Sequence, residues 1–158
     1  MKNILFIALI FFSCKNNKEV ENENLKKELI DLPVQIKIID ENNLVGFACY
    51  YSGRRSEPVE KITEILERKN YNELKKKISS EKPAEKYLAT FACIKLLKNE
   101  IIELDQNELN QIEENKKSDL KIDFCGGCTN NENYKISELF SEKIEFTTAV
   151  ENWFNQIK

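Results

Sequence analysis

One stretch of the sequence, residues 87–97, is apolar on almost every side when it is drawn as a helix. It reads Tyr-Leu-Ala-Thr-Phe-Ala-Cys-Ile-Lys-Leu-Leu, and only Thr90 and Lys95 interrupt it. A helix that is apolar all round packs against neighbours on most of its sides. Because crossing a bilayer takes about 20 apolar residues, this shorter stretch predicts the central helix of a folded domain.

The composition excludes several kinds of chemistry. The chain of 158 residues contains no His, which removes Ser-His-Asp and Cys-His catalysis, His-containing zinc sites and c-type haem attachment. The net charge of −3 comes from interspersed charges of both signs, whereas nucleic-acid binding usually shows as a clustered basic face. Gly and Pro are scarce, at four and three residues, which favours helices over an all-β architecture. We therefore expect a mainly α fold without a cofactor, a nucleic-acid partner or an enzymatic activity.

The N-terminus has the pattern of a secretory signal. Lys2 supplies a positive charge, residues 4–12 form an unbroken apolar run, and Ser13 and Cys14 follow. The run is too short to span a membrane and has the length of a signal-peptide core. A small residue followed by Cys at the end of such a run resembles the lipobox of bacterial lipoproteins, although Phe11 stands where that family usually has Leu.

The resemblance implies cleavage after Ser13 and diacylation of Cys14. Several acyl chains hold a protein stably at a membrane, so the expected location is the bacterial cell envelope, at the outer membrane. The alternative is an ordinary signal peptide in which this Cys is incidental. Residues 15–28 are polar and charged, which is typical of a flexible tether. We expect a single folded domain over residues 29–158.

The segment 34–51 permits two interpretations. Apolar and polar residues alternate over 34–39, and another apolar segment follows a polar stretch, which is typical of a β-hairpin. Alternatively, the Phe-Ala-Cys of residues 47–49 recurs at 91–93, and this spacing resembles that of HEAT and armadillo helical repeats. We prefer the second interpretation. It makes residues 44–51 a helix equivalent to the central one and predicts a short stack of helical hairpins.

Capping signals divide the rest of the chain into helices, because Ser, Asn, Asp or Thr followed by Glu or Pro is typical of a helix N-terminus. The last predicted helix bears Trp153 and Phe154, which we expect in the core. A short strand is predicted over residues 120–124. The predicted helices begin at Ser56 with Pro58, Asn70 with Glu73, Asp105 with Glu108, and Thr148 with Glu151.

The cysteines carry a second set of expectations. Two glycines separate Cys125 from Cys128, and they allow the turn that a local disulfide needs. A thiol–disulfide redox centre is an alternative, since a strand followed by Cys-x-x-Cys is the thioredoxin order, and a soft-metal site is another. Cys49 and Cys93 lie in apolar surroundings and read as buried residues. A bond between them would contradict the repeat, because equivalent positions on stacked helices lie about 8–10 Å apart.

One loop combines aromatic and basic residues. It reads Tyr50-Tyr51-Ser-Gly-Arg54-Arg55. Tyr and Arg are favoured at binding hot spots, so the loop is a candidate partner-contact surface. The competing interpretation is an ordinary surface loop whose arginines pair with nearby glutamates.

The leading functional hypothesis is a membrane-anchored envelope lipoprotein with a non-enzymatic binding or scaffolding role toward a protein partner. It follows from the anchor, from the absence of a catalytic set, and from helical stacking, which creates concave binding surfaces. The alternative is a thiol–disulfide or soft-metal role for Cys125 and Cys128. An immunity-type protein that blocks a toxin at the membrane has the same sequence features as the leading hypothesis.

Overall fold

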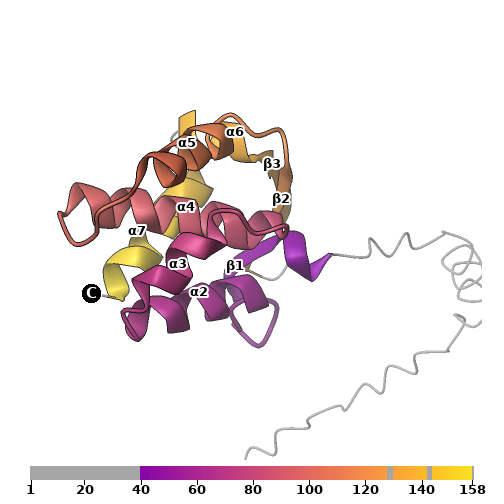
Figure 1. Cartoon of the computed structure of the whole chain (residues 1–158). Helices are drawn as coiled ribbons and strands as arrows, with labels where there is room; N and C mark the ends of the chain where they lie inside the picture. The colour runs from indigo at the N-terminus through magenta and orange to yellow at the C-terminus, as the bar shows by residue number, and fades with distance from the viewer. Residues whose placement is uncertain (1–39, 128–129, 142–143, 158) are drawn as a thin grey trace, which may run out of the picture. The chain divides into compact units, whose positions relative to one another are not determined.

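A computed structural model of the chain describes residues 40–127, 130–141 and 144–157, all within the unit Ile38–Lys158. The predicted signal peptide, Cys14, the predicted tether and the strand predicted over 34–39 lie outside the described residues. The described part contains six α-helices and a small three-stranded sheet, which confirms the prediction of a mainly α fold with short strands (Figure 1).

The sheet brings together segments that are far apart in the sequence. Its strand order is β1-β2-β3, with β1 parallel to β2 and β2 antiparallel to β3. The helices α2 to α5 lie in the crossover between the parallel strands. Along the chain the elements are η1 (Glu41–Asn43), β1 (Leu44–Cys49), α2 (Glu57–Glu67), α3 (Tyr71–Lys77), α4 (Pro83–Lys98), α5 (Gln106–Asn115), β2 (Lys121–Gly127), β3 (Asn130–Lys135), α6 (Ile136–Ser141) and α7 (Glu145–Gln156).

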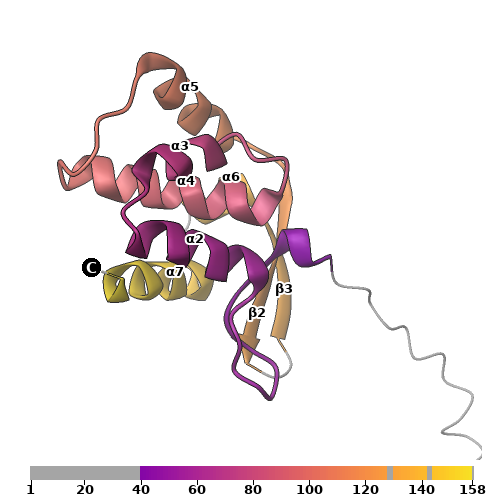
Figure 2. The same cartoon turned by 60° about the horizontal axis from the view of Figure 1, so that its bottom comes forward.

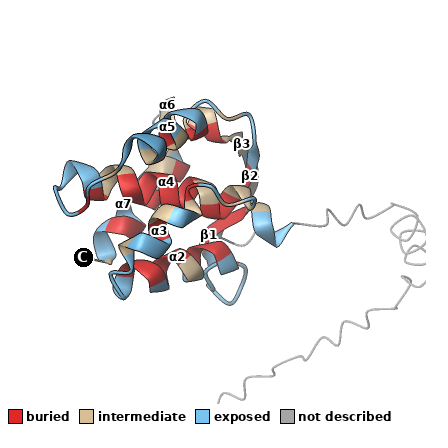
Figure 3. Cartoon of the chain, in the orientation of Figure 1, coloured by how far each residue is buried: buried red, intermediate tan, exposed pale blue. Residues whose placement is uncertain are grey.

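The central helix is α4, as the sequence predicted. Pro83 lies in its first turn, where a missing N–H costs nothing because that group has no partner within the helix. Tyr87, Leu88 and Ala92 are completely buried, and α2, α3, α5 and β2 all contact α4. Figure 3 shows the buried residues of α4 enclosed by these neighbours. A helix with no polar face is therefore covered on most sides.

Two of the predicted N-caps are confirmed in detail. The backbone N–H of Glu108 donates to Asp105 Oδ1 at 2.8 Å, and the N–H of Asp105 donates to Glu108 Oε2 at 2.8 Å, which forms a capping box at α5. Asn70 caps α3 by accepting a hydrogen bond from the N–H of Glu73. These caps were predictable because every partner lies within one helical turn.

Of the other two predicted N-caps, one is partly correct and one is wrong. The helix α2 begins after Ser56 as predicted, but the Ser56 hydroxyl does not cap it. The predicted capping box at Thr148 is wrong, because α7 begins at Glu145 and Thr148 lies inside it. The hydroxyl of Thr147 instead accepts a hydrogen bond from the N–H of Ile144 at 3.1 Å.

Residues 44–49 form a strand, so the helical interpretation that we preferred for this segment is wrong. Pairing with β2 buries Leu44 and Val45 almost completely and provides partners for the backbone. Gly46 also disfavours a helix, by about 1 kcal/mol relative to Ala. Since residues 91–93 are helical, the two Phe-Ala-Cys segments are not equivalent, and the HEAT-like repeat is not confirmed.

The C-terminal helix is fastened to the body by Trp153, which is buried as predicted. Its indole N–H donates to the Thr63 hydroxyl at 2.9 Å, and that hydroxyl donates to the carbonyl of Val59 at 2.6 Å. A buried indole N–H normally needs such a partner. The contact joins α7 to α2 across 90 residues of sequence.

A buried carboxylate joins three helical segments. Glu85, on the first turn of α4, is 2% exposed. It accepts hydrogen bonds from Lys61 of α2 at 2.8 Å and from Ser80 at 3.1 Å, and it pairs with Lys77 of α3 at 3.1 Å. Burial raises the pKa of Glu85, but the bonds from the two lysines outweigh that effect and hold the pKa below its ordinary value of 4.5.

We expect Glu85→Gln to lower the free energy of unfolding by about 2 kcal/mol at neutral pH. The value is below the range for a fully buried pair because both lysines remain partly exposed. A carboxyl group whose pKa is lowered by folding stabilises the protein above its unfolded pKa, and this contribution is lost as the pH falls through the folded pKa. The difference between wild type and variant should therefore shrink below about pH 4.5, as measured by urea unfolding.

The matched control is Glu113→Gln. Glu113 also accepts a lysine hydrogen bond, from Lys116 at 2.8 Å, but it is exposed. We expect its unfolding midpoint to stay close to that of the wild type. Equal losses from the two substitutions would contradict the assigned role of Glu85.

Candidate functional site

The candidate partner-contact loop, residues 50–55, connects β1 to α2 and is exposed throughout. The Tyr51 side chain is 100% exposed and that of Tyr50 is 46% exposed. In Figure 2 the loop extends beyond the ends of β2 and β3 at the bottom of the view, and Figure 3 shows it as exposed. A fully solvated aromatic ring at the tip of a projecting loop is available for contact with another molecule.

The backbone of this loop is held closed at its base. The N–H of Cys49 donates to the carbonyl of Arg54 at 2.7 Å, and the N–H of Gly53 donates to the carbonyl of Tyr50 at 3.2 Å. The N–H of Tyr50 donates to the carbonyl of Gly127, at the end of β2. Tyr50 has a φ of 58°, a left-handed conformation that costs a residue other than Gly about 1 kcal/mol. The surrounding hydrogen bonds maintain it.

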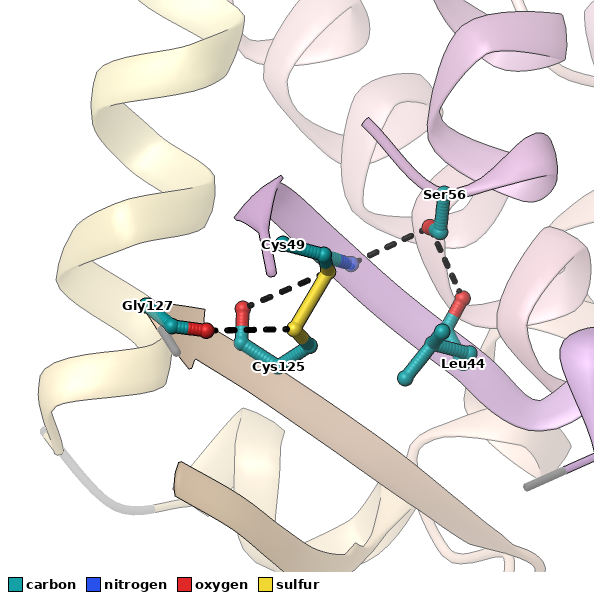
Figure 4. Close-up of a disulfide and its surroundings, with 6 residues drawn as sticks. Leu44, Cys49, Ser56, Cys125 and Gly127 are labelled. Carbon is teal, nitrogen blue, oxygen red and sulfur yellow. Dashed lines mark hydrogen bonds between the residues drawn. A yellow bond between two sulfur atoms is a disulfide. The ribbon is translucent and has the colours of Figure 1, made fainter. Parts of the chain in front are cut away.

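A disulfide lies directly beneath the loop. Cys49, the last residue of β1, is bonded to Cys125 of β2, with the two Cα atoms 5.6 Å apart (Figure 4). Both cysteines are almost completely buried and pack against Leu44. The bond joins residues 76 positions apart, so it fixes the end of β1, where the loop begins, to the sheet.

Gly46 makes room for this disulfide. A Cβ atom at Gly46 would overlap Cys49 Sγ and would lie 3.1 Å from Cys125 Cβ. Next to Gly46, Ser56 forms hydrogen bonds with the backbone of β1. Its hydroxyl accepts a hydrogen bond from the N–H of Gly46 at 3.1 Å and donates to the carbonyl of Leu44 at 3.0 Å (Figure 4). This use explains why the hydroxyl does not cap α2.

The structure gives Cys125 a different partner from the one that its sequence spacing predicted. Cys125 is bonded to Cys49, whereas Cys128 lies outside the described residues. The reason is the register of the parallel strands, which sets Cys125 opposite Gly46 and brings its side chain to Cys49. Cys93 is buried, as expected, and is free, and burial raises the pKa of its thiol to about 12.

Arg54 and Arg55 do not form the ion pairs that the competing interpretation required. Among the residues that the structure describes, neither guanidinium pairs with a carboxylate. The sequence predicts these residues as a contact loop, but not that they lack a carboxylate partner within the described part of the chain. The disulfide beneath them is not predictable either, because no local signal links Cys49 to Cys125.

Other features of the described part give weaker indications of function. No group of three or more His, Cys, Asp or Glu side chains there is arranged to hold a metal ion. None of the described helices combines the length and the apolar character that a membrane span needs. One hollow of about 260 Å³ is lined mainly by apolar side chains, including Leu66, Leu96 and Phe154, and one of about 410 Å³ includes Phe91 and Glu151.

Comparisons with known proteins add no further assignment. No protein-family model matches the chain, and no curated protein or solved structure matches it significantly.

The role of Gly46 can be tested with a double-mutant cycle. We expect Gly46→Ala to lower the free energy of unfolding by about 2 kcal/mol, since forcing a methyl group into a filled site costs about 1–3 kcal/mol. In a Cys49→Ala background the overlapping sulfur is absent, and the same substitution should cost less than about 1 kcal/mol. Denaturant unfolding under oxidising conditions measures all four proteins. Equal costs in the two backgrounds would show that the disulfide is not what requires the glycine.

Proposed function

We propose that the protein is a lipid-anchored lipoprotein of the bacterial envelope whose folded domain binds a protein partner through the loop 50–55. The lipobox resemblance at Ser13 and Cys14 supports the anchor, and the polar residues 15–28 support a tether. The proposed role is binding rather than catalysis, because the exposed loop 50–55 combines tyrosine with arginine, the residue types favoured at binding hot spots.

The observation that carries the binding role is that, within the described part of the chain, Arg54 and Arg55 have no carboxylate partner and lie beside the fully exposed Tyr51. Arg and Tyr are enriched at the energetic centres of interfaces. Covering about 100 Å² of the tyrosine ring would contribute about 2.5 kcal/mol. Because the hydrogen bonds at the base already hold the loop, little of this gain is lost in ordering it.

A thiol–disulfide or soft-metal role for Cys125 and Cys128 is the second proposal. The observation in its favour is that Cys125 lies near the end of a strand, β2, as in the thioredoxin order. The structure, however, bonds Cys125 to Cys49. This bond lies in the sheet and is buried with Leu44, and buried disulfides exchange slowly because exchange needs access to a sulfur. The proposal therefore ranks below a binding role.

The binding proposal predicts contact at one position in living cells. A photo-reactive phenylalanine analogue in place of Tyr51 should form a discrete crosslinked product with a protein partner. The product should disappear when Arg54 and Arg55 are both replaced by Gln, because the loop would lose its charged anchors. Gel mobility and mass spectrometry of the membrane fraction identify the product.

The matched control carries the same analogue at Leu120, which is 42% exposed at the opposite end of β2. It should not form that product. Equal products from both positions, or a product that survives the loss of both arginines, would count against the loop. Cys14→Ser should remove the protein from the membrane fraction, and a variant that stays there would contradict the anchor.

The two proposals also differ in the cysteine pairing that they require. Peptide mapping without reduction should give a crosslinked pair of peptides joined by Cys49 and Cys125. Cys93 should react with an alkylating agent only after unfolding, because it is buried. A bond between Cys125 and Cys128, with Cys49 readily alkylated in the folded protein, would instead favour the thiol–disulfide role.

A further inference from the structure

We infer that the loop 50–55 recognises an acidic segment of its protein partner. Arg54 and Arg55 would each hold a carboxylate, and the Tyr51 ring would pack on the apolar atoms beside it. The inference rests on the proposed binding function of the same loop and adds the chemistry of the partner.

The loop 50–55 carries arginine rather than lysine, and this is the first reason to expect an acidic partner. Only three of the 24 basic residues in the chain are arginines, and two of the three are Arg54 and Arg55. A guanidinium group is planar and forms two parallel hydrogen bonds with a carboxylate, whereas a lysine ammonium acts as a point charge. A chain that otherwise uses lysine therefore places adjacent arginines where bidentate recognition of carboxylates is possible.

The ion pairing of the third arginine, Arg68, differs from that of the loop arginines, and this is the second reason. Arg68 pairs with Glu64 one helical turn away on α2, at 3.2 Å. Arg54 and Arg55, in contrast, have no carboxylate partner among the residues that the structure describes, although the chain contains 27 acidic residues. Their charges are therefore available to carboxylates of another molecule.

The geometry of the loop is the third argument. The Arg54 carbonyl is hydrogen-bonded to the N–H of Cys49, which is itself bonded to Cys125. The backbone that carries Arg54 is thus attached to the sheet at a residue that cannot move far. Fixing a binding group in advance reduces the entropy that is lost when a partner binds.

An acidic protein segment fits this surface better than an anionic membrane or a nucleic acid. Recognition of anionic lipid surfaces uses clusters of about four to eight basic residues, each contributing about 1 kcal/mol, and the loop supplies two. At a protein interface, one or two arginines with a tyrosine are enough to form a hot spot.

The arginine side chains themselves provide the test. The chain contains three arginines, and in the full-length protein labelled with ¹⁵N we expect a separate Nε–Hε signal from each. Titration with poly-L-glutamate should shift the signals of Arg54 and Arg55 and leave that of Arg68 unchanged. Replacing both loop arginines by Lys keeps the charge but removes the bidentate geometry, and it should weaken binding about tenfold.

The matched control is Arg68→Gln, which should not change the affinity for poly-L-glutamate. Equal shifts at all three arginines, or no shift at Arg54 and Arg55, would overturn the inference. Loop-dependent binding to phosphatidylcholine vesicles that contain phosphatidylglycerol, without binding to poly-L-glutamate, would assign the loop to a lipid surface. If the crosslink at Tyr51 still depends on both arginines while poly-L-glutamate fails to bind, the acidic chemistry is wrong and the binding function stands.

Discussion

Parallel strands cannot be joined by a tight turn, so the pairing of β1 with β2 determines how the rest of the domain is built. A parallel connection needs a crossover of a dozen or more residues, and here it contains α2 to α5. The helix α4 lies within this crossover and is covered on most sides. The same pairing brings Cys49 to Cys125 and sets the point from which the loop 50–55 projects. Core and candidate site therefore have one structural origin.

Charged side chains of the domain lie in two different environments, one buried and one exposed. The carboxylate of Glu85 is buried and bonded to two lysines and a serine, because an unpaired buried charge would be very costly. Arg54 and Arg55 are exposed, where an unpaired charge is well solvated. The first arrangement contributes to the stability of three helical segments. The second leaves charge at the surface, and this is what a binding role requires.

Local features of the fold could be predicted from the sequence, and features that depend on distant pairing could not. The helix α4 and the cap at Asp105 follow from residues within one or two turns of each other. Residues 44–49 are ambiguous because a short apolar run fits a strand or a helix equally well. This segment forms a strand because it pairs with β2, which is distant in the sequence. The partner of Cys125 depends on the same long-range pairing.

The disulfide connects the proposed location of the protein with the proposed function of its loop. Closing a loop of 76 residues contributes about 4 kcal/mol in the chain-entropy description, and such bonds persist mainly outside the cytosol. The lipobox resemblance at Cys14 is the separate basis of the proposed envelope location, where disulfides can persist. In a reducing one, Cys49 would no longer be bonded to β2, and the segment carrying Arg54 would be held by hydrogen bonds alone. Rigid presentation of the arginines therefore depends on where the protein resides.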